Sequence, residues 1–222
     1  MRTLLIDTAE RLWGAEPREA VSLRAIAREA GVAPGALTHH FADRGDLLEA
    51  LIAKRFGAVA EATSVRLTAL IEQEAPVGVD DVIVAALQPL IDVVNADPVS
   101  GFWWLRVFCN LGLMGSPVWR KAIVAQTELE HLYSAAAARA MPNLTDIEVR
   151  SRTVIALFSA MAALANADSE GLGHPLGPDG LDPLFVQQLL LFTSAGLAAT
   201  PFPKSRATGR RHSARRAKER LH

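Results

Sequence analysis

Apolar residues recur at spacings of three and four along most of the chain, a pattern that predicts amphipathic helices. Strand-like alternation with hairpin turns and internal repeats are both absent from the sequence. The expected fold class is therefore all-α. The pattern predicts six longer helices, Leu47 to Glu74, Val79 to Asn95, Ser100 to Leu113, Pro117 to Met141, Thr145 to Ala167 and Pro183 to Ala198.

Two shorter helices are expected between Ser22 and Phe41, on either side of Gly31 and Val32. Ser22 is a favoured capping residue for the first helix, and glycine tolerates the left-handed backbone of a sharp reversal. Pro34 suits the first turn of the second helix, where an N–H is not needed. Two short helices about such a turn form a helix-turn-helix, so double-stranded DNA is the expected partner.

These residues resemble the DNA-binding domain of TetR-family transcriptional regulators. The resemblance runs from about Arg2 to Phe56, and IAREAGVAPGALTHHF looks like the family's helix 2, turn and helix 3. Thr3 to Trp13 looks like its first helix, and ADRGDLLEALI from Ala42 looks like the start of its fourth. Beyond Phe56 the likeness is architectural only. It implies a three-helix DNA-binding domain at 1–56, a helical effector-binding and dimerisation domain at 57–203, and a tail at 204–222.

The recognition helix supplies most of the expected DNA contacts. We expect Pro34, Gly35 and Ala36 to face base edges, and Arg24 to contact a guanine. The residues expected to hold the sugar-phosphate backbone are Ser22, Thr38, His39, His40 and Arg44. Ala33 and Thr38 depart from the serine and tyrosine that the family commonly places there for backbone contacts, whereas Arg44 matches a phosphate-anchoring basic residue.

Charge is divided unevenly along the chain. Residues 1–56 carry eight basic and eight acidic side chains, whereas 57–203 have a net charge of −8 and 204–222 of +7. A DNA-binding domain with no net charge predicts modest non-specific affinity for DNA, because basic side chains that neutralise phosphates drive such binding. The composition of the basic tail is typical of a disordered segment that improves solubility. It also allows an additional, non-specific contact with DNA phosphates, and both interpretations stay open.

One cysteine, Cys109, excludes an internal disulfide framework and any multi-cysteine metal site, and we expect it to be a buried thiol. The chain starts without a signal-peptide pattern and has no membrane-length apolar run. These features predict a cytoplasmic protein, and the resemblance implies a bacterial one. We expect it to bind no metal and no cofactor.

The segment FWWLRVFCNLGLMGSPVW contains three of the chain's four tryptophans, which suggests an apolar ligand cavity. The alternative is that its aromatic side chains simply fill the core. The candidate effector-binding residues are Trp103, Trp104, Arg106, Phe108, Asn110, Trp119, Gln126 and His131, with Tyr133 as a further polar candidate.

The last two helices are apolar over much of their circumference, so each needs burial on more than one side. A second copy of the chain supplies such burial, and in TetR-like proteins these helices pair into a four-helix dimer interface. The alternative is complete burial within one monomer.

Together these features predict a homodimeric repressor that a hydrophobic small molecule releases from a palindromic operator. The alternative is a helical ligand-binding or protein-interaction module that has lost specific DNA binding. An enzyme is not expected, because the nucleotide-binding, metalloprotease, hydrolase and paired-cysteine signatures are all missing.

Overall fold

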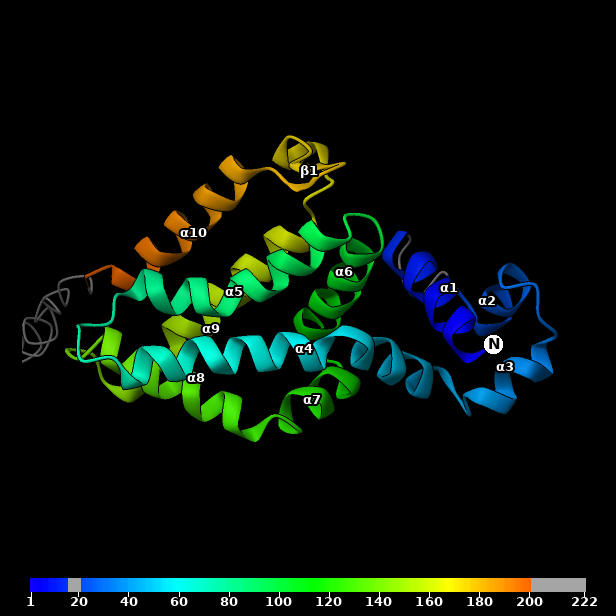
Figure 1. Cartoon of the computed structure of the whole chain (residues 1–222), viewed down its shortest axis with the longest axis horizontal. Helices are drawn as coiled ribbons and strands as arrows, with labels where there is room; N and C mark the ends of the chain where they lie inside the picture. The colour runs from blue at the N-terminus through cyan, green and yellow to red at the C-terminus, as the bar shows by residue number, and fades with distance from the viewer. Residues whose placement is uncertain (16–20, 201–222) are drawn as a thin grey trace, which may run out of the picture.

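The computed structural model describes residues 1–15 and 21–200, and within these ranges the chain is almost entirely helical (Figure 1). The α-helices are α1 (Arg2–Ala15), α2 (Leu23–Glu29), α3 (Pro34–His40), α4 (Arg44–Glu72), α5 (Val79–Ala96), α6 (Ser100–Leu113), α7 (Pro117–Val124), α8 (Thr127–Ala140), α9 (Asp146–Ala165) and α10 (Pro183–Ala198). Before α10 lie a 3₁₀ turn (Glu170–Leu172) and two short strands, β1 (Leu176–Gly177) and β2 (Gly180–Leu181). The expected all-α fold with an N-terminal helix-turn-helix is confirmed.

Helices α1 to α3 and the start of α4 form a small head, and the remaining helices form a larger body (Figure 1). Helix α4 is continuous from the head into the body, so the expected boundary at residue 56 falls inside this helix. Within the body, α6 packs on both α9 and α1, while α10 packs on α9 and α5. The expected tail at 204–222 lies outside the described residues.

Capping side chains set several helix boundaries. The Asp43 carboxylate accepts a hydrogen bond from the Asp46 backbone N–H at 3.0 Å, so α4 begins at Arg44 rather than at the expected Leu47. Thr145 and Glu148 form a reciprocal capping box at the start of α9. The expected bounds of α6 and α10 are confirmed.

The expected single helix from Pro117 to Met141 is wrong. The helical ladder breaks at Ala125 and Gln126, which separates α7 from α8. At the break, the Gln126 N–H donates to Ile123 O, a tightened turn that ends α7. The break allows α7 to contact α6 while α8 runs against α4. No glycine or proline marks this position, so the apolar pattern alone suggested one continuous helix.

The expectation of no strands is also wrong in one place, where β1 and β2 form a two-stranded antiparallel pair. Strands of two residues are too short to produce a detectable alternation of apolar and polar positions. The Leu181 N–H donates to Asn95 Oδ1 at 3.0 Å, which ties the pair to α5. No helix within the described ranges is long and apolar enough to cross a membrane.

Candidate nucleic-acid interface and effector cavity

The turn between α2 and α3 is closed by backbone hydrogen bonds. Gly31 has a φ of +68°, a conformation that favours glycine. Its N–H donates to Arg28 O at 3.1 Å, and the Val32 N–H donates to Ala27 O at 3.0 Å. These two bonds form a Schellman motif, which ends α2 and directs the chain into α3.

Helix α3 presents its first turn to the outside and anchors its other face in the head. Leu37 and Phe41 are each only 2% exposed and belong to the core. Gly35 is exposed, with no atom within 4 Å of the position a Cβ would take, and Ala36 is half-buried. Because small residues stand at the exposed turn, the α3 backbone can approach another surface closely.

The polar residues around α3 differ in how they are held. The Ser22 Oγ accepts from the Ala25 N–H at 3.2 Å and so caps α2. The Thr38 hydroxyl donates to Gly35 O at 3.0 Å, so in this rotamer it can only accept a further bond. His39 is exposed, and its ring lies 5.4 Å from that of the half-buried His40.

Arginine side chains flank α3 on several sides. Arg24 and Arg28 project from α2 and are exposed. The Arg44 guanidinium lies 5.0 Å over the ring of the buried Trp13, and that of Arg2 lies 5.2 Å over Phe41. Aromatic rings thus hold two of these cations, Arg2 against the residue that ends α3 and Arg44 against α1. Ala33 stands immediately before α3, is exposed and provides no side-chain cap.

A family model described as "Bacterial regulatory proteins, tetR family" matches residues 5–51, which run from α1 into α4 and include the whole helix-turn-helix. Residues 5–51 therefore form a DNA-binding domain of TetR type. No curated protein matches the sequence. The match supports a DNA-binding transcriptional regulator, whose helix-turn-helix lies in the head.

The TetR-type head is joined to the body by a polar cluster around Glu10, which is only 1% exposed. Its carboxylate accepts hydrogen bonds from Lys54 Nζ, at 3.1 Å to each oxygen, and from the Ser100 hydroxyl. Arg55 donates to Asp97 at 2.9 Å and to Ser100 Oγ at 2.8 Å. This junction cluster connects α1 and α4 to the start of α6. Burial lowers the pKa of Lys54, but hydrogen bonds to Asp7 and Glu10 outweigh it and raise that pKa overall.

Asp97 gives the junction cluster a dependence on acid pH. Burial raises the pKa of this carboxyl, but hydrogen bonds from Arg55 and the Ser100 backbone outweigh it, so the pKa is lowered overall. Because the pKa of Asp97 is lower in the folded protein than in the unfolded chain, its ionised carboxylate stabilises the fold when the pH is above the unfolded-state pKa. This stabilisation is lost as the pH falls through the folded-state pKa.

We therefore expect Asp97→Asn to reduce the free energy of unfolding at pH 7 by less than about 1 kcal/mol, because the carboxylate is partly exposed. The difference from the unmutated protein should shrink towards pH 3. Urea unfolding at pH 7, 4 and 3 measures this, and a difference that grows on acidification would contradict the assignment.

Arg106 and Trp103 form a second link between body and head. Arg106 donates to Gly14 O and to Ala165 O, each at 2.9 Å, and pairs with Asp168. A Cβ placed on Gly14 would come within 2.5 Å of the Trp103 Cβ, so α1 and α6 are in close contact here. Both side chains therefore connect α6 to the end of α1.

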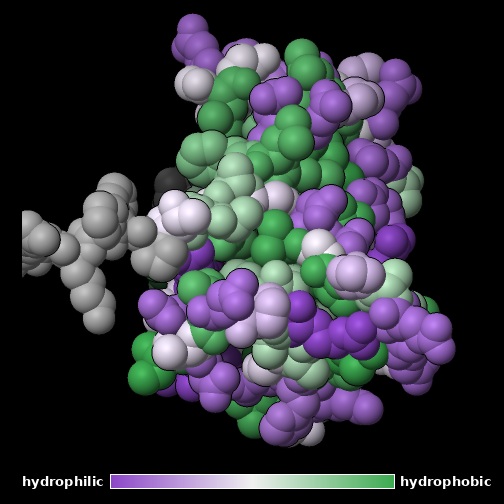
Figure 2. All heavy atoms as spheres, turned by 90° about the vertical axis from the view of Figure 1, so that its left-hand side faces the viewer, coloured by the Kyte–Doolittle hydropathy of each residue, from purple (hydrophilic) through white to green (hydrophobic). Residues whose placement is uncertain are grey.

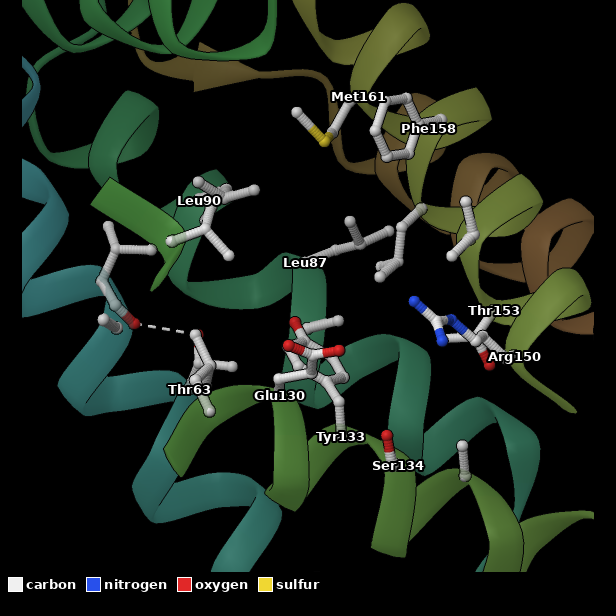
Figure 3. A pocket seen from close by; sticks show the side chains of 18 of the residues that line it. Thr63, Leu87, Leu90, Glu130, Tyr133, Ser134, Arg150, Thr153, Phe158 and Met161 are labelled. Carbon is white, nitrogen blue, oxygen red and sulfur yellow. Dashed lines mark hydrogen bonds between the residues drawn. The ribbon is translucent and has the colours of Figure 1, made fainter. Parts of the chain in front are cut away.

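The body contains a cavity of about 590 Å³ between α4, α5, α8 and α9, bounded at one end by α6 and α7. Leu87, Leu90, Phe158 and Met161 are among its many apolar lining residues (Figure 3). This volume lies within the roughly 300–1,000 Å³ typical of small-molecule sites. Its size and apolar wall suit a hydrophobic ligand.

The expected effector residues divide into two groups. Phe108, Trp119 and the further candidate Tyr133 line the cavity. The six other candidates are not among its lining residues, and these are Trp103, Trp104, Arg106, Asn110, Gln126 and His131. Gln126 lies at the break before α8, and His131 is exposed. The aromatic segment thus contributes two side chains to the cavity and uses the others for packing and links between helices.

Trp104 connects the cavity wall to α4. Its ring stacks on that of Phe108 at 5.1 Å, and its Nε1 donates to Leu51 O at 3.1 Å. The Phe108 ring also lies 5.2 Å from Phe56 and 6.2 Å from Trp119. A continuous set of ring contacts therefore runs from the cavity to the backbone of the helix that enters the head.

Sequence reasoning missed the polar side chains of the cavity. Glu130 and Ser134 come from α8, and Asp146 and Arg150 from α9. Each resembles a solvent-facing residue of an amphipathic helix, so no local signal distinguishes it. The buried Cys109 matches its expectation, and burial raises the pKa of its thiol. Among residues 1–15 and 21–200, no three or more metal-ligating side chains are grouped as a metal site would require.

Proposed function

We propose that the protein is a homodimeric repressor that a small apolar effector releases from a palindromic operator. The observation that carries this proposal is the exposed, small-residue first turn of α3 at the end of a TetR-type head. Two such heads related by a two-fold axis would enter successive major grooves, about 34–36 Å apart. A two-fold dimer then requires an operator with the same symmetry.

The dimer part of the proposal is supported by α10. This helix has 16 residues and no charged side chain, yet only Thr193 and Leu197 are buried. Leu191 is 57% exposed and Phe192 77% exposed. A helix so apolar requires a partner on its open side.

Helix α9 extends this apolar surface. Its exposed side chains include Ile155, which is 66% exposed. Arg152 of α9 donates to Leu197 O and Ala199 O, which fixes the end of α10 against α9. In Figure 2, apolar side chains gather at the height that α10 occupies in Figure 1, whereas hydrophilic ones dominate lower on this end. A second copy that offers its own α9 and α10 would cover this surface.

Effector control is supported by the cavity and by the contacts that link it to the head. A ligand shifts a two-state protein only by its difference in affinity between the states. The proposed effector would favour the arrangement of heads that does not fit the operator. Because coupling is reciprocal, operator DNA should weaken effector binding by the same factor.

The number of chains bound per operator duplex tests whether the protein binds DNA as a dimer. Sedimentation velocity of the full chain with an operator duplex obtained by selection should show two chains per duplex at saturation. Binding of one chain per duplex, with no dimer in free solution, would overturn the proposal.

Arg24 is proposed to read a guanine from the exposed side of α2. Arg24→Ala should weaken operator binding by about 1–3 kcal/mol and relax preference at one base pair. Arg44→Ala should instead weaken selected and random duplexes alike, as loss of a phosphate contact would. Fluorescence anisotropy on both kinds of duplex separates the two roles. Equal losses on both duplexes for Arg24→Ala would remove it from base recognition.

A further inference from the structure

The cavity has two chemically different ends. In Figure 3, Leu90, Phe158 and Met161 lie at one end, while Tyr133, Ser134 and Arg150 lie towards the other. An occupant that matches both ends has an apolar body and one polar head. The orientation follows, since the head would lie between α8 and α9.

The hydrogen-bonding groups of the wall limit what this head can be. Thr63 and Thr153 already donate their hydroxyl protons to backbone carbonyls, Val59 O at 2.8 Å and Val149 O at 2.9 Å. The Tyr133 hydroxyl makes no such bond within the described part of the chain. Burial raises the pKa of Tyr133, so this group stays a neutral O–H donor.

Arg150 is the cation of this wall, as far as the structure describes the lining. Its side chain extends from α9 into the space facing α8 (Figure 3). No ion pair with a described carboxylate holds it there. A guanidinium presents a planar fork of N–H donors that matches a carboxylate. Arg150 and Tyr133, together with the Ser134 hydroxyl, are donors at this end that can meet a ligand oxygen.

Two acidic side chains also line the polar end. Glu130, Asp146 and Arg150 are all exposed, so water screens the charges of this end, and the forked hydrogen bonds of the guanidinium rather than charge alone favour a carboxylate. The two acids can only accept hydrogen bonds, so neither can satisfy a carboxylate oxygen of a ligand. An ammonium head would suit these acids but would leave the donors unused and lie beside a cation.

We propose that the effector is an apolar carboxylic acid, with its chain or ring against Leu90, Phe158 and Met161 and its carboxylate between Arg150 and Tyr133. This inference rests on the proposed effector role of the cavity and specifies the chemistry of the ligand. The residues that would select the polar head of the ligand then lie on α8 and α9, outside the aromatic segment.

The test compares three probes that share one chain and differ in the head, namely decanoic acid, decylamine and decan-1-ol, by calorimetric titration of the full-length protein at pH 8. Decanoate should bind most tightly. Arg150→Gln should weaken decanoate binding about tenfold and leave decan-1-ol unchanged. Arg150→Glu should reverse the preference in favour of decylamine.

Arg120→Gln is the matched control, because Arg120 is an exposed arginine of α7 outside the cavity lining. Its three affinities should equal those of the unmutated protein. Binding of decylamine or decan-1-ol at least as tight as that of decanoate would overturn the inference, as would decanoate binding that is insensitive to Arg150→Gln. No binding of any probe would overturn it too.

Operator binding measured alongside distinguishes this inference from the proposed function. If decanoate binds through Arg150 but leaves operator affinity unchanged, the ligand class stands and the release mechanism fails. If only the alcohol or the amine binds and releases DNA, the release mechanism stands and the carboxylate assignment fails.

Discussion

Phe192→Asp is expected to convert the protein into a monomer and to abolish high-affinity operator binding. Phe192 is 77% exposed on α10, which belongs to the surface proposed to pair with a second copy. Two-fold symmetry would place two new carboxylates in one apolar interface. Burying a charge without a partner costs several kcal/mol, so the dimer dissociation constant should rise by more than about 1,000-fold.

Analytical ultracentrifugation at micromolar concentration measures this change directly. Val124→Asp is the matched control, since Val124 is 67% exposed but lies at the end of α7, outside the surface formed by α9 and α10. The control should remain dimeric and bind operator normally. An unchanged Phe192→Asp dimer would place the interface elsewhere, and a monomeric unmutated protein would remove the dimer altogether.

Glu10→Ala is expected to destabilise the fold by about 1–3 kcal/mol, because it removes the buried acceptor that Lys54 and Arg55 share, although each keeps a second acidic partner. For a chain of this length each kcal/mol lowers the melting temperature by about 2–4 °C. The substitution also removes the contact between α1 and Ser100 at the start of α6. Operator binding should then respond less to effector, because head and body are less firmly joined.

Asp7→Ala provides the comparison within the same helix. Asp7 also pairs with Lys54, at 2.8 Å, but its side chain is 50% exposed. Its removal should cost less than about 1 kcal/mol. Chemical denaturation of both variants measures the difference. Equal effects of the two substitutions would show that the junction cluster does not depend on the buried carboxylate.

The helix-turn-helix was predictable because its signals are local. Ser22 caps α2, Gly31 takes the left-handed turn and Pro34 starts α3, each as the residue type suggests. None of these features depends on a distant segment. The same holds for the capped start of α9 and for the proline at the start of α10.

The cavity was only partly predictable, because its walls come from helices far apart in sequence. Aromatic density identified α6 but not the side of the helix that faces the cavity. Residues two apart on a helix point in nearly opposite directions, so Phe108 faces the cavity while Arg106 reaches α1. The buried role of Glu10 is a similar case, since its partners lie on α4 and α6.

Selection from random DNA duplexes with the full chain, followed by sequencing, tests the central claim most directly. Two exposed α3 turns carried by one symmetric dimer predict an enriched palindrome whose half-site centres lie about one helical turn apart, or a multiple of it. Gly35→Glu should abolish the enrichment, because it places a charged side chain where the α3 backbone is proposed to meet the duplex. Selection that yields no shared sequence, or a single half-site without symmetry, would contradict the account.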